Sequence, residues 1–252
     1  MPETITRNLP VLALRGVTAF PGQTVSFDVE REISIYALDN AMESDRRIFA
    51  ITQKELSTSE PGERDLYAVG TVCHILQIVK TSDTTVRVVV EGESRARLLR
   101  LWQTQPFLQG QAELLPEQPA RSTARTEALL RRTYVLFDDY RQLASGLSDD
   151  FTAAVLDCRD AGELADLIAQ NITLRHQDRQ RVLEELHPEK RLRLVNDILT
   201  HEVDVLSLES EMEQKVRRRV AQVQRDMILR EQVKVLQHEL GEDGDEELEA
   251  YA

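Results

Sequence analysis

The chain has 252 residues, of which 41% are hydrophobic and 30% charged, a composition typical of a globular protein and not of a disordered one. Its net charge of −13 argues against a general DNA- or RNA-binding surface. No apolar run approaches the ~18–20 residues of a membrane helix, no N-terminal targeting segment is recognisable, and two distant cysteines make no disulfide framework. These features predict a cytoplasmic protein of one or two domains without a membrane partner.

The first 115 or so residues carry short apolar runs separated by turn residues, which is typical of β-strands. The stretch 31–45 interrupts them and is expected to be helical, with Ile33, Ala37 and Ala41 on its inner face. Short strands at this spacing favour a small barrel or sandwich over a parallel sheet. Strands are predicted over residues 9–16, 24–30, 47–53, 66–80 (long enough for two strand pieces bent near Gly70), 84–92, 94–102 and 107–115.

The composition changes at Pro116 and Pro119, and no strand-like alternation survives beyond them. Apolar residues then recur at helical spacing, and Ser148 precedes one such segment as a candidate N-cap. We therefore predict a bundle of short helices over 118–204, with helices at 123–144, 161–171 and 176–186 and one that runs over Phe151, Val155 and Leu156.

No proline or glycine occurs between Pro188 and Leu240, which predicts an unusually long helix. Apolar residues at spacings of three and four make the part over 205–241 coiled-coil-like, so it should seek a partner along its length. The helix is expected to end at Gly241. Residues 242–252, which include six acids, are interpreted as a disordered acidic linker or tail.

Motifs for covalent chemistry are missing from the sequence. No glycine is followed by lysine, so a phosphate-binding loop is absent, and neither a GxSxG nor a CxxC motif occurs. Cys73 and His74 are adjacent in a predicted strand, where neighbouring side chains point to opposite faces. The basic residues Lys215 and 217–219 are spread around a helix, which favours a solvated or ion-paired surface over a nucleic-acid site. We expect no catalytic residue, cofactor or metal in this chain.

Three segments resemble the N-terminal region of the ATP-dependent Lon protease family. Residues 9–42 (LPVLALRGVTAFPGQTVSFDVEREISIYALDNAM) are similar to the opening of its N-terminal domain, and 66–101 are similar to a second signature with a "vGt…ilq" strand. Residues 222–242 (QVQRDMILREQVKVLQHELGE) resemble the segment that precedes the family's ATPase module. The resemblance implies an α+β fold: a twisted, β-barrel-like domain over 1–117, the helical bundle and the long helix.

The same resemblance implies a function. Lon proteases degrade misfolded and short-lived regulatory proteins, and their N-terminal region is expected to recognise unfolded or damaged substrates. ATP and Mg²⁺ would act in an ATPase module, and a Ser–Lys dyad in a protease module, neither of which this sequence contains. The full-length parent is expected to be a homo-hexamer, and nucleic acid is not an expected partner of this region.

A receptor for unfolded chains needs exposed apolar surface. The residues expected to provide it are Phe20 and Pro21 in a turn, and Ile35 and Leu38, which fall outside the Ile33 stripe. Plain core packing is the alternative for each of them. Two other functions stay open from the sequence: a stand-alone LON-domain adaptor with a fused helix, and a coiled-coil oligomerisation scaffold.

Overall fold

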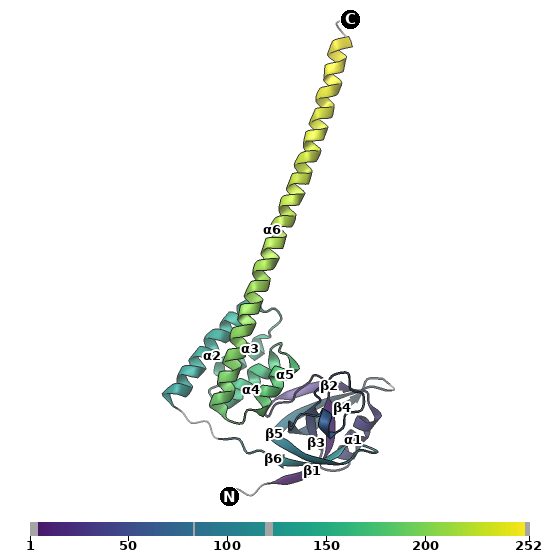
Figure 1. The fold of residues 1–252 in the computed structure, drawn as a ribbon, viewed down its shortest axis with the longest axis vertical. Helices are drawn as coiled ribbons and strands as arrows, with labels where there is room; N and C mark the ends of the chain where they lie inside the picture. Colours follow the sequence, from purple (N-terminus) through teal and green to yellow (C-terminus); the bar gives the residue numbers. More distant parts are fainter. Residues whose placement is uncertain (1–4, 83, 119–122, 250–252) are drawn as a thin grey trace. The chain divides into compact units, whose positions relative to one another are not determined.

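The computed structural model describes residues 5–82, 84–118 and 123–249. Its contacts divide into two units, residues 1–201 and 202–252, and each is described by itself (Figure 1). The first unit is an α+β structure in which a β domain precedes a group of helices, as the sequence predicted.

The β domain is a mixed six-stranded sheet in the order β2-β5-β4-β3-β1-β6, which an additional pairing of β5 with β6 closes into a barrel-like structure. Strands β1 and β3 run parallel, and the other paired strands are antiparallel. The strands are β1 (Thr6–Leu14), β2 (Thr24–Val29), β3 (Arg47–Thr52), β4 (Val69–Lys80), β5 (Val86–Gln103) and β6 (Gln109–Leu114).

Two strand predictions were wrong. The segments 84–92 and 94–102 form one strand, β5. It pairs with β2 over 86–91, with β4 over 86–97 and with β6 over 96–103. The segment 66–80 contributes the single strand β4, without a second piece before Gly70. Register shifts in the β4–β5 and β5–β6 ladders let one long strand bend around the barrel instead of breaking into two.

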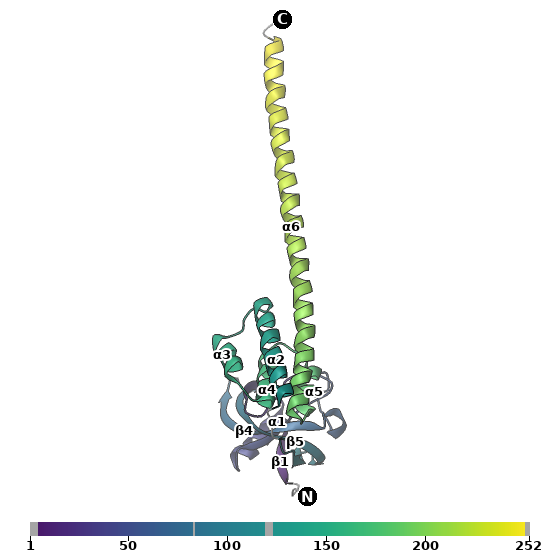
Figure 2. The ribbon, with the colours of Figure 1, turned by 90° about the vertical axis from the view of Figure 1, so that its left-hand side faces the viewer.

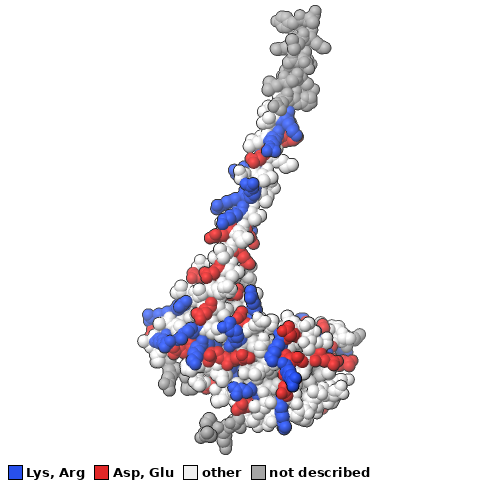
Figure 3. Space-filling view, in the orientation of Figure 1, with Lys and Arg blue, Asp and Glu red and all other residues white. Residues whose placement is uncertain are grey.

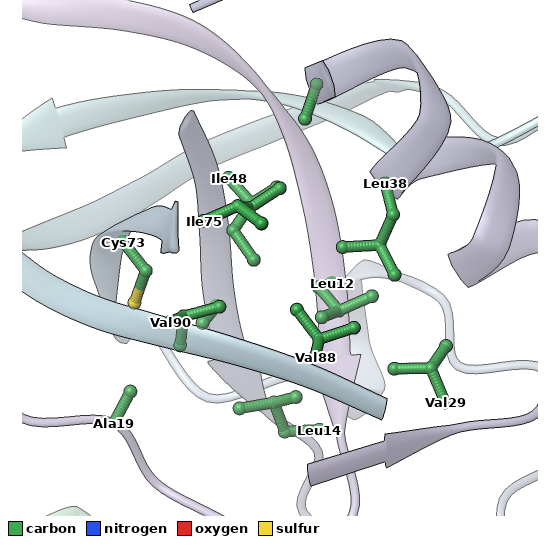
Figure 4. Close-up of a cluster of buried hydrophobic side chains, with 12 residues drawn as sticks. Leu12, Leu14, Ala19, Val29, Leu38, Ile48, Cys73, Ile75, Val88 and Val90 are labelled. Carbon is green, nitrogen blue, oxygen red and sulfur yellow. The ribbon is translucent and has the colours of Figure 1, made fainter. Parts of the chain in front are cut away.

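Helix α1 (Glu32–Met42) lies against β1 and β3 and covers one of the two core clusters. Its buried side chains are Ser34, Ala37, Leu38 and Ala41, so the inward stripe includes Leu38 as well as the predicted Ala37 and Ala41. In Figure 4, Leu38 points from α1 toward Leu12 and Val88 of the sheet. A short 3₁₀-helix, Glu63–Asp65, precedes β4.

The remaining helices of the first unit are α2 (Ala124–Leu143), α3 (Asp149–Asp157), α4 (Ala161–Asn171), α5 (His176–Glu184) and the beginning of α6 (Figure 2). Ser148 caps α3 as predicted, because its side chain accepts a hydrogen bond from the Phe151 N–H. Phe137 of α2 and Phe151 of α3 pack edge to face, with ring centroids 5.4 Å apart. The short helices thus form a bundle with its own apolar contacts.

Helix α6 runs from Pro188 to Glu249, so its predicted end at Gly241 is wrong. A glycine costs a helix only about 1 kcal/mol, and the helix-forming residues that follow Gly241 allow it to continue. In the second unit the large apolar side chains from Leu208 to Leu236 are exposed. No helix among the described residues is both long and apolar enough to cross a membrane.

Candidate functional site

The turn that carries Phe20 and Pro21 is fastened to β4 and β5. The Gly22 N–H donates to the Gly92 carbonyl at 2.8 Å, and the Gly92 N–H donates to the Gln23 carbonyl at 3.0 Å. The Thr71 hydroxyl donates to the Ala19 carbonyl at 2.7 Å. Gly92 allows this close approach, since a Cβ there would collide with the Phe20 carbonyl. The turn is therefore a fixed part of the barrel and not a free loop.

Phe20 has no exposed surface, so the expectation that it presents an aromatic side chain to a substrate is wrong. Burial of an aromatic ring stabilises the domain by more than a solvent-facing position would, and the fastened turn holds the ring inside. Pro21, in contrast, lines a cavity of about 330 Å³ at the surface of the β domain. Whether Pro21 contacts a substrate stays a prediction.

This cavity, called the Pro21 cavity below, is predominantly apolar. It lies where the end of β6 and the following segment approach β5, and it is lined by Ile5, Pro21, Glu93, Ser94, Arg95, Leu114, Leu115, Pro116 and Glu117. The sequence reasoning missed Ile5, Leu115 and Pro116, because these residues come from opposite ends of the β domain. The one sequence feature close to Leu115 and Pro116 that attracted notice was the change of composition at Pro116.

Arg95 belongs to a cluster of buried charges beneath this cavity. Its Nη2 atom donates to both carboxylate oxygens of Asp166 in α4, at 2.6 and 2.8 Å, and its Nε donates to the Leu183 carbonyl at 2.9 Å. Arg191 of α6 has its Nε 3.2 Å from the Asp166 Oδ1 atom and also donates to Glu117. Arg95, Asp166 and Arg191 are almost completely buried, whereas Glu117 is half-exposed.

The cluster joins the β domain to the helices of the first unit. Arg95 comes from β5, Asp166 from α4 and Arg191 from the first turn of α6. A second polar bond between the same parts runs from Gln180 Nε2 in α5 to the Val69 carbonyl of β4, at 2.9 Å. Buried charges must be paired to be tolerated, so this network fixes how the helices dock on the barrel.

The two predicted contact residues of α1 differ in their positions. Leu38 is 1% exposed and sits in the core cluster of Figure 4, so its predicted exposure is wrong. The reason is that α1 turns a wider face toward the barrel than the Ile33 stripe suggested. Ile35 is partly buried against the same cluster, and its contact with a substrate stays a prediction. The structure does not bring Ile35 and Leu38 into the Pro21 cavity.

The exposed apolar residues of the second unit share one helix. They are Leu208, Met212, Val216, Val220, Val223, Met227, Ile228, Leu229, Val233, Val235 and Leu236. Figure 3 shows basic and acidic side chains next to each other along this helix. Arg217 lies 3.3 Å from Glu213, and Lys215 lies 3.8 Å from Glu211, as expected for an ion-paired surface.

The two cysteines differ in burial. Cys73 is buried in the core, where burial raises the pKa of its thiol, and Cys158 is half-buried with its thiol pKa raised for the same reason. In the part of the chain that the structure describes, no three His, Cys, Asp or Glu side chains gather in a way that could hold a metal ion.

Comparisons of this chain with a family model and with known proteins all point to the same family. The family model described as the ATP-dependent protease La (LON) substrate-binding domain matches residues 8–201. The chain is 37% identical over 250 residues to a Lon protease of Clostridioides difficile, covering 98% of this chain and 32% of that protein. It is 36% identical over 242 residues to Lon protease 1 of Bacillus subtilis, covering 96% of this chain and 31% of that protein. The chain thus spans about a third of the length of the curated relatives it matches.

Solved structures have the same fold. The N-terminal domain of a Mycobacterium avium complex Lon protease superposes with a TM-score of 0.61 at 21% identity, covering 77% of this chain and 98% of that one. A Lon N-terminal domain protein from Xanthomonas campestris gives a TM-score of 0.53 at 17% identity, covering 74% of this chain and 95% of that one. The family match over most of the chain, together with its Lon protease relatives, shows that this chain belongs to the Lon substrate-binding domain family.

Proposed function

We propose that this chain recognises unfolded or damaged polypeptides for an ATP-dependent serine protease, and holds them for the modules that unfold and cleave them. The family description and the Lon protease relatives support this role. We infer a cytoplasmic location, in keeping with cysteines that are both free.

The observation that carries the proposal is the Pro21 cavity. Unfolded polypeptides expose apolar side chains, and a receptor for them needs a preformed apolar recess on a rigid support. The recess has a volume of about 330 Å³, and the fastened turn and the buried ion cluster make it rigid. Its apolar wall can bind different apolar side chains, as a protease that acts on varied substrates requires.

Substitution of two cavity residues tests this role. Ile5 is 56% exposed and Leu115 is partly exposed, so Ile5→Ser with Leu115→Ser removes apolar surface without opening the core. Each lost apolar contact removes at most roughly 1–2 kcal/mol of binding. We expect weaker capture of a fluorescent unfolded client by the double variant. Capture by the parent should persist at 1 M salt, where the Debye length is about 3 Å.

The control is the matched pair Val135→Ser and Leu156→Ser, which removes exposed apolar residues from α2 and α3. This control should bind the client like the parent. Both double variants must keep the parent's circular dichroism and melting behaviour. Equal binding by the parent and the cavity variant, or loss of binding in salt alone, would contradict the assignment.

ATP and Mg²⁺ act, in this proposal, in a module outside these 252 residues, and peptide cleavage by a Ser–Lys dyad in a further one. The relatives are about three times as long as this chain, and the sequence has no Gly-Lys pair. The isolated chain should therefore neither hydrolyse ATP nor cleave an unfolded client. This prediction would be overturned if the highly purified chain showed turnover of ATP or client, and if a substitution within the chain abolished that turnover.

We further propose that α6 takes part in assembly of the homo-oligomer, a hexamer in the full-length parent. The exposed apolar residues between Leu208 and Leu236 support this, because such a stripe gains stability by packing on another helix. A stable oligomer of the isolated chain, measured as solution mass, would favour the scaffold alternative. If the downstream gene sequence lacked a GxxxxGK[ST] motif, the stand-alone adaptor would be favoured.

A further inference from the structure

Helix α1 begins without a side-chain cap. Arg31 is its N-cap residue, and the side chain of Arg31 makes no capping hydrogen bond. The Ser34 and Ile35 N–H groups donate to the Arg31 carbonyl at 3.0 Å, whereas the N–H groups of Glu32 and Ile33 have no acceptor among the described residues. The first N–H groups of a helix point out of its end, together with the positive end of its dipole. This end of α1 therefore offers donors to an anion, provided that its surroundings can hold one.

A cavity of about 240 Å³, called the α1 cavity below, borders this end of the helix. Arg31, Ile33 and Ser34 line it from the start of α1. Polar residues also line it from the segments that precede β4 and β6, namely Ser59, Thr104 and Gln105. The α1 cavity shares no lining residue with the Pro21 cavity. Its volume is that of several water molecules, so a small, partly hydrated anion fits.

Ser34 is a buried polar residue of this cavity without a partner in the protein. It is 7% exposed, and its hydroxyl makes no hydrogen bond with a described residue. Ser44, just beyond the other end of α1, differs in this respect, because its hydroxyl donates to the Asn40 and Ala41 carbonyls. The Ser34 hydroxyl is not among the unpaired polar atoms that are sealed from solvent. An unpaired buried hydroxyl is costly, so a ligand in the α1 cavity that reaches this hydroxyl would satisfy it.

Two arginines give the start of α1 a positive charge. The Arg31 Nη2 atom donates to Gln53 Oε1 at 2.8 Å and to the Thr58 carbonyl at 3.2 Å, which leaves its Nε and Nη1 donors without a protein acceptor. Arg15 donates to the same carbonyl at 3.5 Å, and it lines an adjoining cavity that also contains Arg31 and Ser34. No carboxylate among the described residues forms an ion pair with either guanidinium. Burial and the neighbouring Arg15 together lower the pKa of Arg31, in keeping with a charge that lacks an acidic partner.

The acids near this end of α1 oppose an anion only weakly. Glu60 is the one carboxylate that lines the α1 cavity, and it is exposed. Glu30, which lines the adjoining cavity, and Glu32, in the first turn of α1, are exposed too. Asp28 of the adjoining cavity is held by Arg87, whose Nε and Nη2 atoms donate to its carboxylate oxygens at 2.7 and 2.8 Å. Water and salt screen exposed charges much more than buried donors, so the donors of the cavity decide its preference.

We propose that the α1 cavity binds inorganic phosphate. The phosphate oxygens accept hydrogen bonds from the N–H groups at the start of α1, from the Ser34 hydroxyl and from Arg31, while Arg15 adds attraction from the adjoining cavity. A tetrahedral oxyanion accepts hydrogen bonds from several directions at once, which suits donors from main chain, hydroxyl and guanidinium. This inference goes beyond the proposed function, since it concerns a different cavity and a different class of ligand.

The test is calorimetric titration of the full 252-residue chain with inorganic phosphate, against sodium chloride of the same ionic strength. Ser34→Ala removes the unpaired hydroxyl and keeps the helix, because alanine is a strong helix former. Its matched control is Ser44→Ala, which removes a hydroxyl beyond the other end of α1. Arg31→Gln removes a charge from the cavity, and its control is Arg7→Gln in the part of β1 that pairs with β6. Glu60→Gln removes the opposing carboxylate.

We expect the parent to bind millimolar phosphate, and Ser34→Ala and Arg31→Gln to bind it about tenfold more weakly, as loss of a hydrogen bond to a charged group does. Both controls should bind phosphate like the parent. Glu60→Gln should bind it more tightly, a gain that misfolding cannot produce. The inference is overturned if the parent binds no phosphate, if Ser34→Ala binds as well as the parent, or if Arg31→Gln and Arg7→Gln lose equally. No client takes part in these titrations, so their failure leaves the proposed function untouched.

Discussion

Arg191 has no exposed surface, although it carries a charge, and Asp166 is the one buried acid among the described residues that pairs with both it and Arg95. Replacing the carboxylate leaves the two buried guanidinium groups with the half-exposed Glu117 as their remaining acidic partner among the described residues. Asp166→Asn should therefore lower the free energy of unfolding by about 3–5 kcal/mol, as loss of one partner of a buried pair does. Chemical denaturation of the two proteins measures the difference.

The matched control for this substitution is Asp138→Asn, which breaks an exposed pair with Arg141 on α2. Exposed pairs contribute little, so this variant should unfold like the parent. A similar loss of stability in both variants would mean that burial of the cluster is not what makes Asp166 important.

The two cysteines should differ in reactivity because their surroundings differ. Only the thiolate reacts with alkylating reagents; burial raises the pKa of both thiols, and Cys73 is the more deeply buried of the two. In the folded protein at pH 8, iodoacetamide should modify Cys158 first and leave Cys73 unmodified, as mass spectrometry of the peptides would show. In denaturant both should react at similar rates. Rapid modification of Cys73 in the folded state would contradict its place in the core.

At the scale of single elements, the part of α6 in the second unit is the least self-sufficient. From Leu208 to Leu236 its large apolar side chains are about half exposed or more, for example 61% at Val216 and 72% at Met227. A helix gains most of its stability from packing, and within the described chain these side chains have no covering partner. Hydrogen exchange over residues 210–236 should therefore show low protection at high dilution. Protection should rise with concentration if copies pair, and strong protection at every concentration would be inconsistent with this interpretation.

At the scale of the whole molecule, the natural folding unit is the first unit and not the β domain alone. Arg95 and the Val69 carbonyl both have their partners in the helices, through Asp166 and Gln180. A chain of residues 1–206 should unfold at the same temperature as the full chain. A chain of residues 1–117 should be markedly less stable, because Arg95 would lack its buried partner, the Asp166 carboxylate. Circular dichroism melting of the three chains checks this, and equal stability of the shortest would show that the cluster does not couple the two parts.

The sequence by itself determined the order and type of the elements and the family. The alternating run 24–30, the apolar run 47–53, the Ser148 cap and the proline-free stretch after Pro188 are local signals, and local physics alone produces them. The three family-like segments then predicted the barrel-like domain followed by helices. The course of β5 was not readable, since a bend within one strand and a break between two look alike in sequence.

Only the tertiary structure decided which apolar residues are available. Phe20 and Leu38 looked suited to contact a substrate, but the turn fastened at Gly92 and the wide inner face of α1 bury both. The Pro21 cavity unites Ile5 with residues 114–117. Such groupings depend on strand pairing between distant segments, and no local pattern encodes that pairing. The buried cluster of Arg95, Asp166 and Arg191 was invisible for the same reason, because each residue alone looks like an ordinary surface charge.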